Sequence, residues 1–190
     1  VFVTGYENDG SIGATAYVDF TTTSWYTPQI ASHRGASQFL VVATRSGLVT
    51  SIGGRTLAYA HAATTTLTPG APFTIASGPC ANPDVGGDPN PSPGLPGNYC
   101  VTWQGGVLSG VYYNVVRTDT TLLTTAGTLL TPGFPTSGNP AVSKSCGVGA
   151  ANMREWIVVW QYPYSATDVD VWGSRIAGNG AVLTGALPIA

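Results

Sequence analysis

The chain repeats one pair of strand-like runs four times, and this recurrence limits what it can fold into. The first runs are β-branched or aromatic and then turn polar: VFVTGYEND, FLVVATRSG, YCVTWQGGV and WIVVWQYPY. After a loop of variable length come the second runs SIGATAYVD, SIGGRTLAY, VYYNVVRTD and DVWGSRIAG. Small or turn-tolerant residues fall at one place in these second runs, namely Gly13, Gly53, Asn114 and Gly173. The chain therefore contains four copies of one unit.

Proline-bearing runs flank these pairs. A short run containing Pro28, Pro83 or Pro140 precedes the apolar run in three of the units, and these prolines are 55 and 57 positions apart. The units close on PGAPFTIAS, LLTPGFPTS and LTGALPIA. Proline removes a donor from the hydrogen-bond ladder, so it is tolerated in first and last strands, which have an unpaired edge. Four short strands in a unit of about 45–60 residues are typical of a β-propeller.

The sequence predicts an all-β fold, a β-propeller-like array of about four four-stranded blades with the first blade incomplete. The approximate units are 1–27, 28–78, 79–137 and 138–190, within a single propeller-like domain or fragment. Stacking buries both faces of each blade, which accounts for strands that are apolar on both sides. An ordinary β-sandwich with accidental similarity between hairpins is the alternative. Helical periodicity is absent because Gly, Pro and Thr clusters break every candidate window.

The units are unequal at the two ends of the chain. The first unit begins in its second strand, and the last unit ends on its fourth strand. We expect a fragment of a longer propeller, in preference to a strand donated by a neighbouring copy in a head-to-tail contact. The N-terminus lacks the basic and apolar regions of a signal peptide, and we expect further sequence upstream.

The last unit is the most regular copy. WIVVWQYPYSATDVDVWGSRIAGNGAVLTGALPIA resembles the repeats of secreted bacterial propeller-like proteins, which run roughly as LVVW, a polar loop, D-I-Y-G-x-R-V, a small-residue turn, then L and P-I. The matching residues are Val158, Val159, Trp160, Asp170, Val171, Trp172, Gly173, Arg175, Ile176, Leu183, Pro188 and Ile189. The third copy has NVVRTD in this place, and Tyr6 and Ala43 replace the tryptophan of VVW in the first two. The resemblance implies a fold and an export route, and it implies no activity.

The low charge of the chain limits the classes of molecule that it is expected to bind. Charged residues make up 8% and the net charge is -2, against roughly 25% charged residues in an average domain. Such a surface neutralises few phosphates, so we expect no nucleic acid. No run approaches the roughly 18 apolar residues that span a bilayer. Low charge with abundant Thr, Ser and Gly suits a secreted, extracellular or cell-surface protein.

Three cysteines are present, so at least one thiol stays outside any intramolecular disulfide. A Cys80–Cys100 bridge would pin the ends of a proline-rich segment, and closing about 20 residues contributes roughly 3 kcal/mol. A Cys100–Cys146 bridge between neighbouring blades is the alternative. There is no CxxC pair and there are two histidines, so we expect no zinc site, no other metal and no cofactor.

Aromatic side chains are the first candidates for a ligand or contact surface. Tyr112, Tyr113, Tyr162 and Tyr164 are candidates for a sugar-stacking platform. Trp160, like Trp172, recurs at a unit position and is expected between blades. The tyrosines are therefore the residues on which a carbohydrate-binding function would depend.

Acidic residues are the second candidates. Asp168 and Asp170 form a D-V-D pair at a strand entry that could bind calcium or a sugar, although no D-x-D-x-D loop is present. In the plainer interpretation Asp170 caps the strand entry and pairs with Arg175 or another arginine. Glu7 and Glu155 lie at opposite ends of the chain, whereas a glycosidase needs two carboxyl groups within about 5–10 Å.

No catalytic residue is expected. His33 and His61 are expected in solvated loops, and no G-x-S-x-G elbow occurs. The prediction is a non-enzymatic, extracellular structural or adhesive module that assembles with copies of itself or with other surface proteins into a surface layer or fibre. A lectin-like, carbohydrate-binding propeller is the alternative. A fragment of a glycosidase-type propeller enzyme is the further alternative.

Overall fold

All the regular elements described in the computed structural model are strands. The structure describes residues 1–6, 12–19, 23–33, 36–60, 66–88, 97–105, 110–131, 137–144, 147–148 and 154–189. Sixteen strands in these ranges form four antiparallel sheets. None of the described segments forms a helix that is long and apolar enough to cross a membrane. The predicted all-β class is confirmed.

Each sheet consists of strands that follow one another along the chain. The first sheet is the hairpin of β1 (Phe2–Tyr6) and β2 (Ile12–Tyr17). The second sheet contains β3 (Trp25–His33), β4 (Gln38–Arg45), β5 (Ser51–Ala60), β6 (Thr66–Pro69) and β7 (Phe73–Ser77). The third sheet contains β8 (Cys80–Gly86), β9 (Asn98–Gly105), β10 (Gly110–Arg117) and β11 (Thr128–Leu129). The fourth sheet contains β12 (Gly138–Val142), β13 (Gly147–Val148), β14 (Arg154–Pro163), β15 (Val169–Ala177) and β16 (Val182–Pro188).

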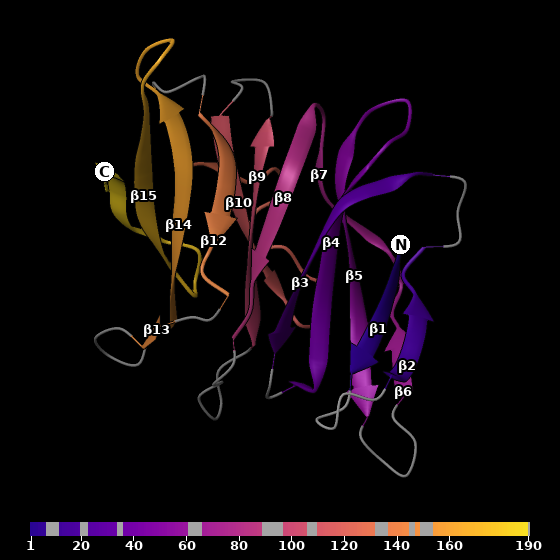
Figure 1. The fold of residues 1–190 in the computed structure, drawn as a ribbon. Helices are drawn as coiled ribbons and strands as arrows, with labels where there is room; N and C mark the ends of the chain where they lie inside the picture. Colours follow the sequence, from indigo (N-terminus) through magenta and orange to yellow (C-terminus); the bar gives the residue numbers. More distant parts are fainter. Residues whose placement is uncertain are drawn as a thin grey trace.

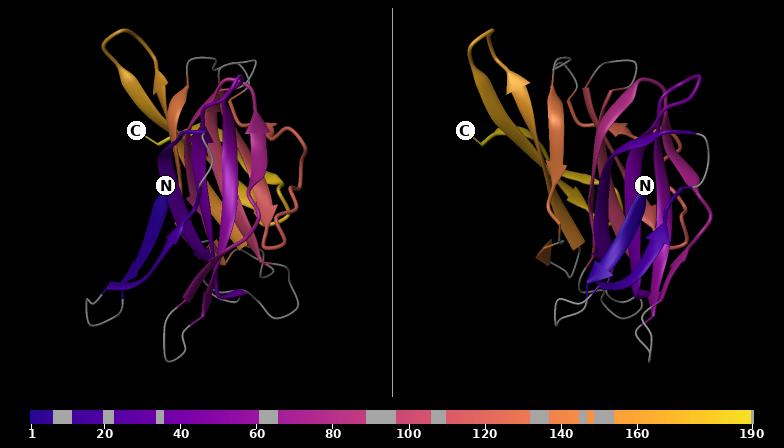
Figure 2. Two further views of the ribbon diagram at one scale, coloured as in Figure 1. Left: turned by 90° about the vertical axis from the view of Figure 1, so that its right-hand side faces the viewer. Right: turned by 45° about the vertical axis from the view of Figure 1, so that its right-hand side comes forward.

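The four sheets stand side by side in chain order, and the two termini lie on opposite sides of the stack (Figure 1). Turned views show the same layers one behind another (Figure 2). In the described ranges these sheets close into neither a barrel nor a propeller. Ring closure and the division into propeller units therefore stay predictions.

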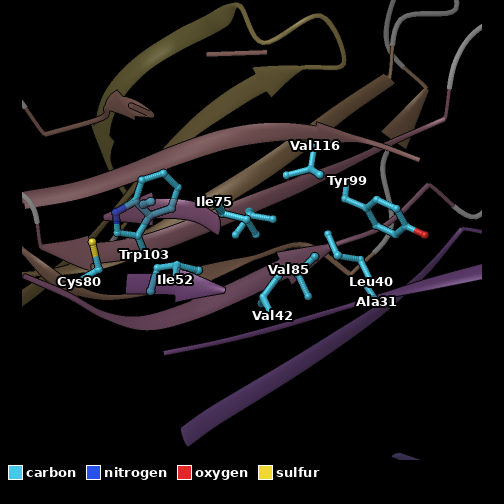
Figure 3. Close-up of a cluster of buried hydrophobic side chains, with 12 residues drawn as sticks. Ala31, Leu40, Val42, Ile52, Ile75, Cys80, Val85, Tyr99, Trp103 and Val116 are labelled. Atoms are coloured by element: carbon cyan, nitrogen blue, oxygen red, sulfur yellow. The ribbon is translucent and has the colours of Figure 1, made fainter. Parts of the chain in front are cut away.

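Hydrophobic clusters fill the spaces between neighbouring sheets. The cluster between the second and third sheets is drawn in Figure 3 and consists of Ala31, Leu40, Val42, Ile52, Ile75, Ala76, Cys80, Val85, Tyr99, Val101, Trp103 and Val116. The cluster between the third and fourth sheets consists of Cys100, Val111, Tyr113, Val115, Leu130, Val142, Trp156, Val158, Trp160 and Ile176. The cluster between the hairpin and the second sheet consists of Ala16, Val18, Val41 and Leu57. The second and third sheets are thus covered on both faces.

The second strand of each middle sheet is buried on both sides. In β9, Tyr99 and Trp103 pack against the second sheet, while Cys100 packs against the fourth. In β4, Leu40 packs toward the third sheet and Val41 toward the hairpin. A strand covered on both faces has an almost continuous apolar sequence instead of an alternating one. The runs FLVV and YCV owe their composition to this packing.

The first strands of the last three sheets share a β-bulge at proline. The pairing register shifts between Tyr26 and Gln29, between Ala81 and Asp84, and between Gly138 and Ala141. In each strand two residues, of which the second is proline, lie opposite one residue of the second strand. The dipeptides are Thr27-Pro28, Asn82-Pro83 and Asn139-Pro140, called here the X-Pro bulges. Proline is tolerated at these places because a bulge has no ladder bond to lose.

Candidate functional site

The three X-Pro bulges occupy equivalent places and have the same backbone conformation. The residue before proline is left-handed in all three, with φ of 52° at Thr27, 49° at Asn82 and 48° at Asn139. Residues other than glycine seldom adopt this conformation, and a following proline disfavours helical backbone further. Strained backbone of this kind gathers at functional sites. The repeated strain therefore marks the bulges as a candidate site.

Side-chain hydrogen bonds connect two of the bulges. The Asn82 amide donates to Gln104 Oε1 at 3.2 Å and to Asn139 Oδ1 at 3.4 Å. The Asn139 amide donates in turn to Gln161 Oε1 at 2.7 Å. Each asparagine thus bonds a glutamine 22 positions later on the neighbouring second strand. This chain of amides holds both asparagine side chains in place across the boundary between two sheets.

Thr27 occupies the equivalent position in the second sheet. Its hydroxyl lies 3.1 Å from the hydroxyl of Thr44, which takes the place of the glutamines in the second strand. Its hydroxyl also donates to the carbonyl of Tyr26 at 2.7 Å. A short hydroxyl contact thus replaces the amide contact in this unit.

The bulges line one cleft of about 430 Å³. Its walls come from the first strands of three sheets and from the residues that follow β12: Thr27, Gln29, Asn82, Pro83, Asp84, Asn139, Pro140, Ala141 and Lys144. Polar side chains of the cleft are mostly exposed amides, whereas Pro83, Asp84 and Pro140 are buried. The arrangement can bind a polar ligand along three sheets at once.

One ion pair supports the cleft. Asp84 is 7% exposed, and its Oδ2 accepts a hydrogen bond from the backbone N–H of Val142 at 2.9 Å. Its Oδ1 accepts a hydrogen bond from the ammonium group of Lys144. A buried carboxylate needs such partners because its desolvation is costly. The pair joins β8 to the chain after β12 and neutralises both charges that line the cleft.

The first strands also approach each other closely. A Cβ atom at Gly87 would lie 1.9 Å from the carbonyl oxygen of Ser32, and one at Gly86 would lie 2.2 Å from that of Ser143. The side chain of Trp156 donates to the carbonyl of Gly87 at 3.0 Å. Glycine is used here because backbone meets backbone.

Of the two predicted tyrosines in β10, Tyr113 is a core residue and Tyr112 is half-buried. Tyr113 is 3% exposed, and its hydroxyl donates to the carbonyl of Gly180 at 2.7 Å. Burial raises the pKa of Tyr113. Tyr112 is half-buried and stacks on Trp103 with ring centroids 6.0 Å apart. The expected surface role of Tyr113 is wrong, because its side chain is buried between the third and fourth sheets, whereas the role of the half-buried Tyr112 stays a prediction.

The other predicted residues meet at the tip of the β14–β15 hairpin. Tyr162 and Asp170 are half-buried cross-strand partners, and the Tyr162 ring lies edge-on to Trp172 at 5.9 Å. Tyr164 is 72% exposed and Asp168 is exposed. The carbonyl of Asp168 accepts backbone hydrogen bonds from residues 164 and 165. This tip is an exposed turn, and its role as a contact surface stays a prediction.

Two further expectations concern charged residues. Arg175 donates from Nε to Glu155 Oε2 at 3.2 Å, so its partner is Glu155 and not the expected Asp170. Glu7, the other residue of the glycosidase hypothesis, lies outside the described residues. In the part of the chain that is described, no group of three His, Cys, Asp or Glu side chains is placed to hold a metal ion.

The predicted Cys80–Cys100 disulfide is not formed. Both cysteines are buried, and they are not bonded to each other. Cys80 pairs with Gly105 at one end of β9, whereas Cys100 pairs with Gly86 near the other end. The two side chains also pack in different clusters, on opposite faces of the third sheet. Cys146, the partner in the alternative bridge, lies outside the described residues.

The expectation of a solvated loop for His33 is wrong. His33 ends β3 and is 3% exposed. Its Nδ1 accepts a hydrogen bond from the backbone N–H of Ala36 at 3.1 Å, and its Nε2 lies 3.9 Å from Asp88 Oδ2. The ring also contacts Tyr99 edge-on at 5.8 Å. His61 lies outside the described residues.

The fourth sheet leaves one apolar face open. Along β14 the side chains alternate, with Trp156, Val158 and Trp160 buried and Ile157 52% exposed. The apolar members of this outer face are Ile157, Val159, Val169, Val171 and Leu187, and the same face carries Gln161 and the Arg175–Glu155 ion pair. The equivalent residues of Ile157 in the second and third sheets, Leu40 and Cys100, are 0% exposed. The next layer of the stack would lie on this face.

The cleft is not predicted by the sequence pattern, although the sequence carries a signal for it. The recurring prolines of the three X-Pro dipeptides predict strands with an unpaired edge and do not by themselves predict bulges. The repeated Asn-Pro at two equivalent places is that signal, because asparagine tolerates left-handed backbone better than most residues.

No protein-family model, no curated protein and no solved structure matches this chain.

Proposed function

We propose that this chain is an extracellular structural or adhesive module of β-propeller-like blades that assembles with copies of itself. The observation that carries the proposal is the outer face of the fourth sheet, where Ile157 stands exposed at a position that is fully buried in the two preceding sheets. Contiguous exposed apolar side chains on a protein surface mark an interaction site. The low charge of the chain supports the extracellular location.

The proposed occupant of the outer face is the β1–β2 hairpin of a second copy. The hairpin packs Val3, Ala16 and Val18 against the second sheet, so its other face is open. Phe2 and Tyr17 on that face are 65% and 54% exposed, with ring centroids 6.3 Å apart. Phe2, Tyr17 and Ile157 are uncharged, and the charged groups beside Ile157, Arg175 and Glu155, are already paired with each other. The contact joins two different surfaces, and such head-to-tail contacts give rings or filaments.

The test uses one substitution on each face. Ile157→Lys blocks the outer face of the fourth sheet, and Tyr17→Lys blocks the hairpin. Leu48→Lys is the matched control, because Leu48 is fully exposed in the β4–β5 turn and belongs to neither face. Mass is measured by light scattering after size-exclusion chromatography at rising protein concentration, with negative-stain electron microscopy of the same samples.

The expected result is assembly of the natural chain and of Leu48→Lys, and monomers of Ile157→Lys and Tyr17→Lys. An equal mixture of the two monomeric variants should give a one-to-one dimer and nothing larger, because each retains one intact face. A natural chain that stays monomeric overturns the proposal. Assembly of Ile157→Lys at wild-type concentrations does the same. If Tyr17→Lys assembles normally, the hairpin is not the occupant.

A further inference from the structure

The cleft of the X-Pro bulges is a second surface, separate from the outer face of the fourth sheet. Five residues other than glycine have positive φ among the described residues, and three of them line this cleft: Thr27, Asn82 and Asn139. The other two, Ser37 and Thr120, lie in connections between strands. The same costly backbone conformation occurs at three equivalent places. In each it places the side chain of the residue before proline in the cleft.

The charges of the cleft exclude most ionic ligands. Its charged lining residues are Asp84 and Lys144, which are bonded to each other. The remaining polar residues, Thr27, Gln29, Asn82 and Asn139, are neutral. An anionic ligand needs several donors and positive charge, and a metal ion needs several oxygen ligands with negative charge. A neutral ligand fits this lining better than either.

The hydrogen-bond capacity of the cleft is mixed. Asn82 donates both of its bonds to Gln104 and Asn139, and its Oδ1 retains acceptor capacity. Asn139 donates to Gln161 and retains a second amide hydrogen. A hydroxyl group both donates and accepts, so it matches donors and acceptors that alternate over a short distance. Polyhydroxylated ligands satisfy this pattern with one kind of group.

Proline disfavours the competing ligand, an extended peptide. A peptide would add to a first strand through backbone hydrogen bonds. Pro83 and Pro140 have no N–H and lie inside the cleft. Prolines on a sheet edge are a known protection against strand addition. We therefore propose that the cleft binds a neutral oligosaccharide, with Asn82 and Asn139 as its principal contacts.

The test measures binding of neutral cello-, malto-, xylo- and laminari-oligosaccharides by isothermal titration calorimetry. Asn82→Gly and Asn139→Gly remove the amides, while glycine accepts the left-handed backbone without strain. Both variants should fold normally, checked by thermal melting, and should weaken binding of the best oligosaccharide at least about tenfold. Thr120→Gly is the matched control because it relieves φ of 71° outside the cleft. It should bind as the natural chain does.

Three outcomes overturn the proposal. The first is that no oligosaccharide of the panel binds at about 10 mM. The second is that the folded Asn82→Gly and Asn139→Gly variants bind as tightly as the natural chain. The third is that an extended peptide library binds at the cleft while the sugars do not. Binding is also measured on the Ile157→Lys variant, so failure of the assembly proposal leaves this test unaffected.

Discussion

At the scale of single residues, buried ionisable groups make the stability of the folded chain depend on pH. Cys100 is fully buried between the third and fourth sheets. Burial, and then the charge of Asp84, raise the pKa of its thiol. Tyr99, buried between the second and third sheets, also has a raised pKa because of burial. These groups keep their protons in the folded chain and lose them at lower pH in the unfolded chain.

The first prediction concerns Cys100. An unfolded thiol ionises above about pH 8.5, so the folded state loses stability from there upward, by at most about 1.4 kcal/mol per pH unit. Unfolded tyrosines ionise only above about pH 10, which leaves a window for the thiol. Urea unfolding at about pH 7.5, 8.5 and 9.5 should therefore show a decline that is smaller in Cys100→Ala. The variant has lower stability at every pH because of its cavity. Equal slopes for both chains would contradict the prediction.

At the scale of strands, the sequence predicts the recurring strands but not how equivalent residues align from one sheet to the next. The proline-bearing first strand, the apolar second strand and the aromatic third strand occur in chain order in each of the last three sheets. The sequence pattern places Gly53, Asn114 and Gly173 at one position of the third strands. The bulges and pairing instead align Gly173 with Gly54 and Tyr113. A shift of one residue reverses the face of a strand, so spacing alone does not decide which face Tyr113 occupies.

The cleft and the separation of Cys80 from Cys100 are beyond local sequence patterns for a related reason. A bulge inserts one residue and turns the side chains that follow to the other face, and its position depends on contacts between sheets. Spacing alone also suggested the Cys80–Cys100 bridge. The antiparallel register places these cysteines near opposite ends of β9. Local sequence patterns reveal which segments are strands, whereas contacts between distant segments decide which side chains meet.

The second prediction concerns the close approach of first strands. Gly87→Ala would place a methyl group on the carbonyl of Ser32, so β8 and β3 would have to separate. Overpacking of this kind costs about 1–3 kcal/mol. Gly185→Ala is the matched control, because nothing lies within 4 Å of its Cβ position in β16. Denaturant unfolding should show a clear loss of stability for Gly87→Ala and little change for Gly185→Ala. Similar losses in both variants would mean that the close approach is not the cause.

At the scale of the whole molecule, stability should vary along the stack. The third sheet is covered by a complete sheet on each side. The hairpin has two strands, and the fourth sheet is covered on one face only. In a repeat array the stability of a unit depends on its own strands and on its contacts with neighbours. Units at the two ends therefore open at lower free energy than the middle of the stack.

The last prediction is an order of hydrogen exchange. Backbone amides of β9 and β10 should exchange most slowly, those of β14 and β15 faster, and those of β1 and β2 fastest. Raising the protein concentration should slow exchange in β1, β2 and β14 together, because the proposed contact covers both ends of the stack at once. The Ile157→Lys variant should lose that concentration dependence and keep the slow exchange of β9. Uniform exchange in all four sheets would contradict the prediction, since it would mean that the stack opens as one unit and that its exposed faces carry no local instability.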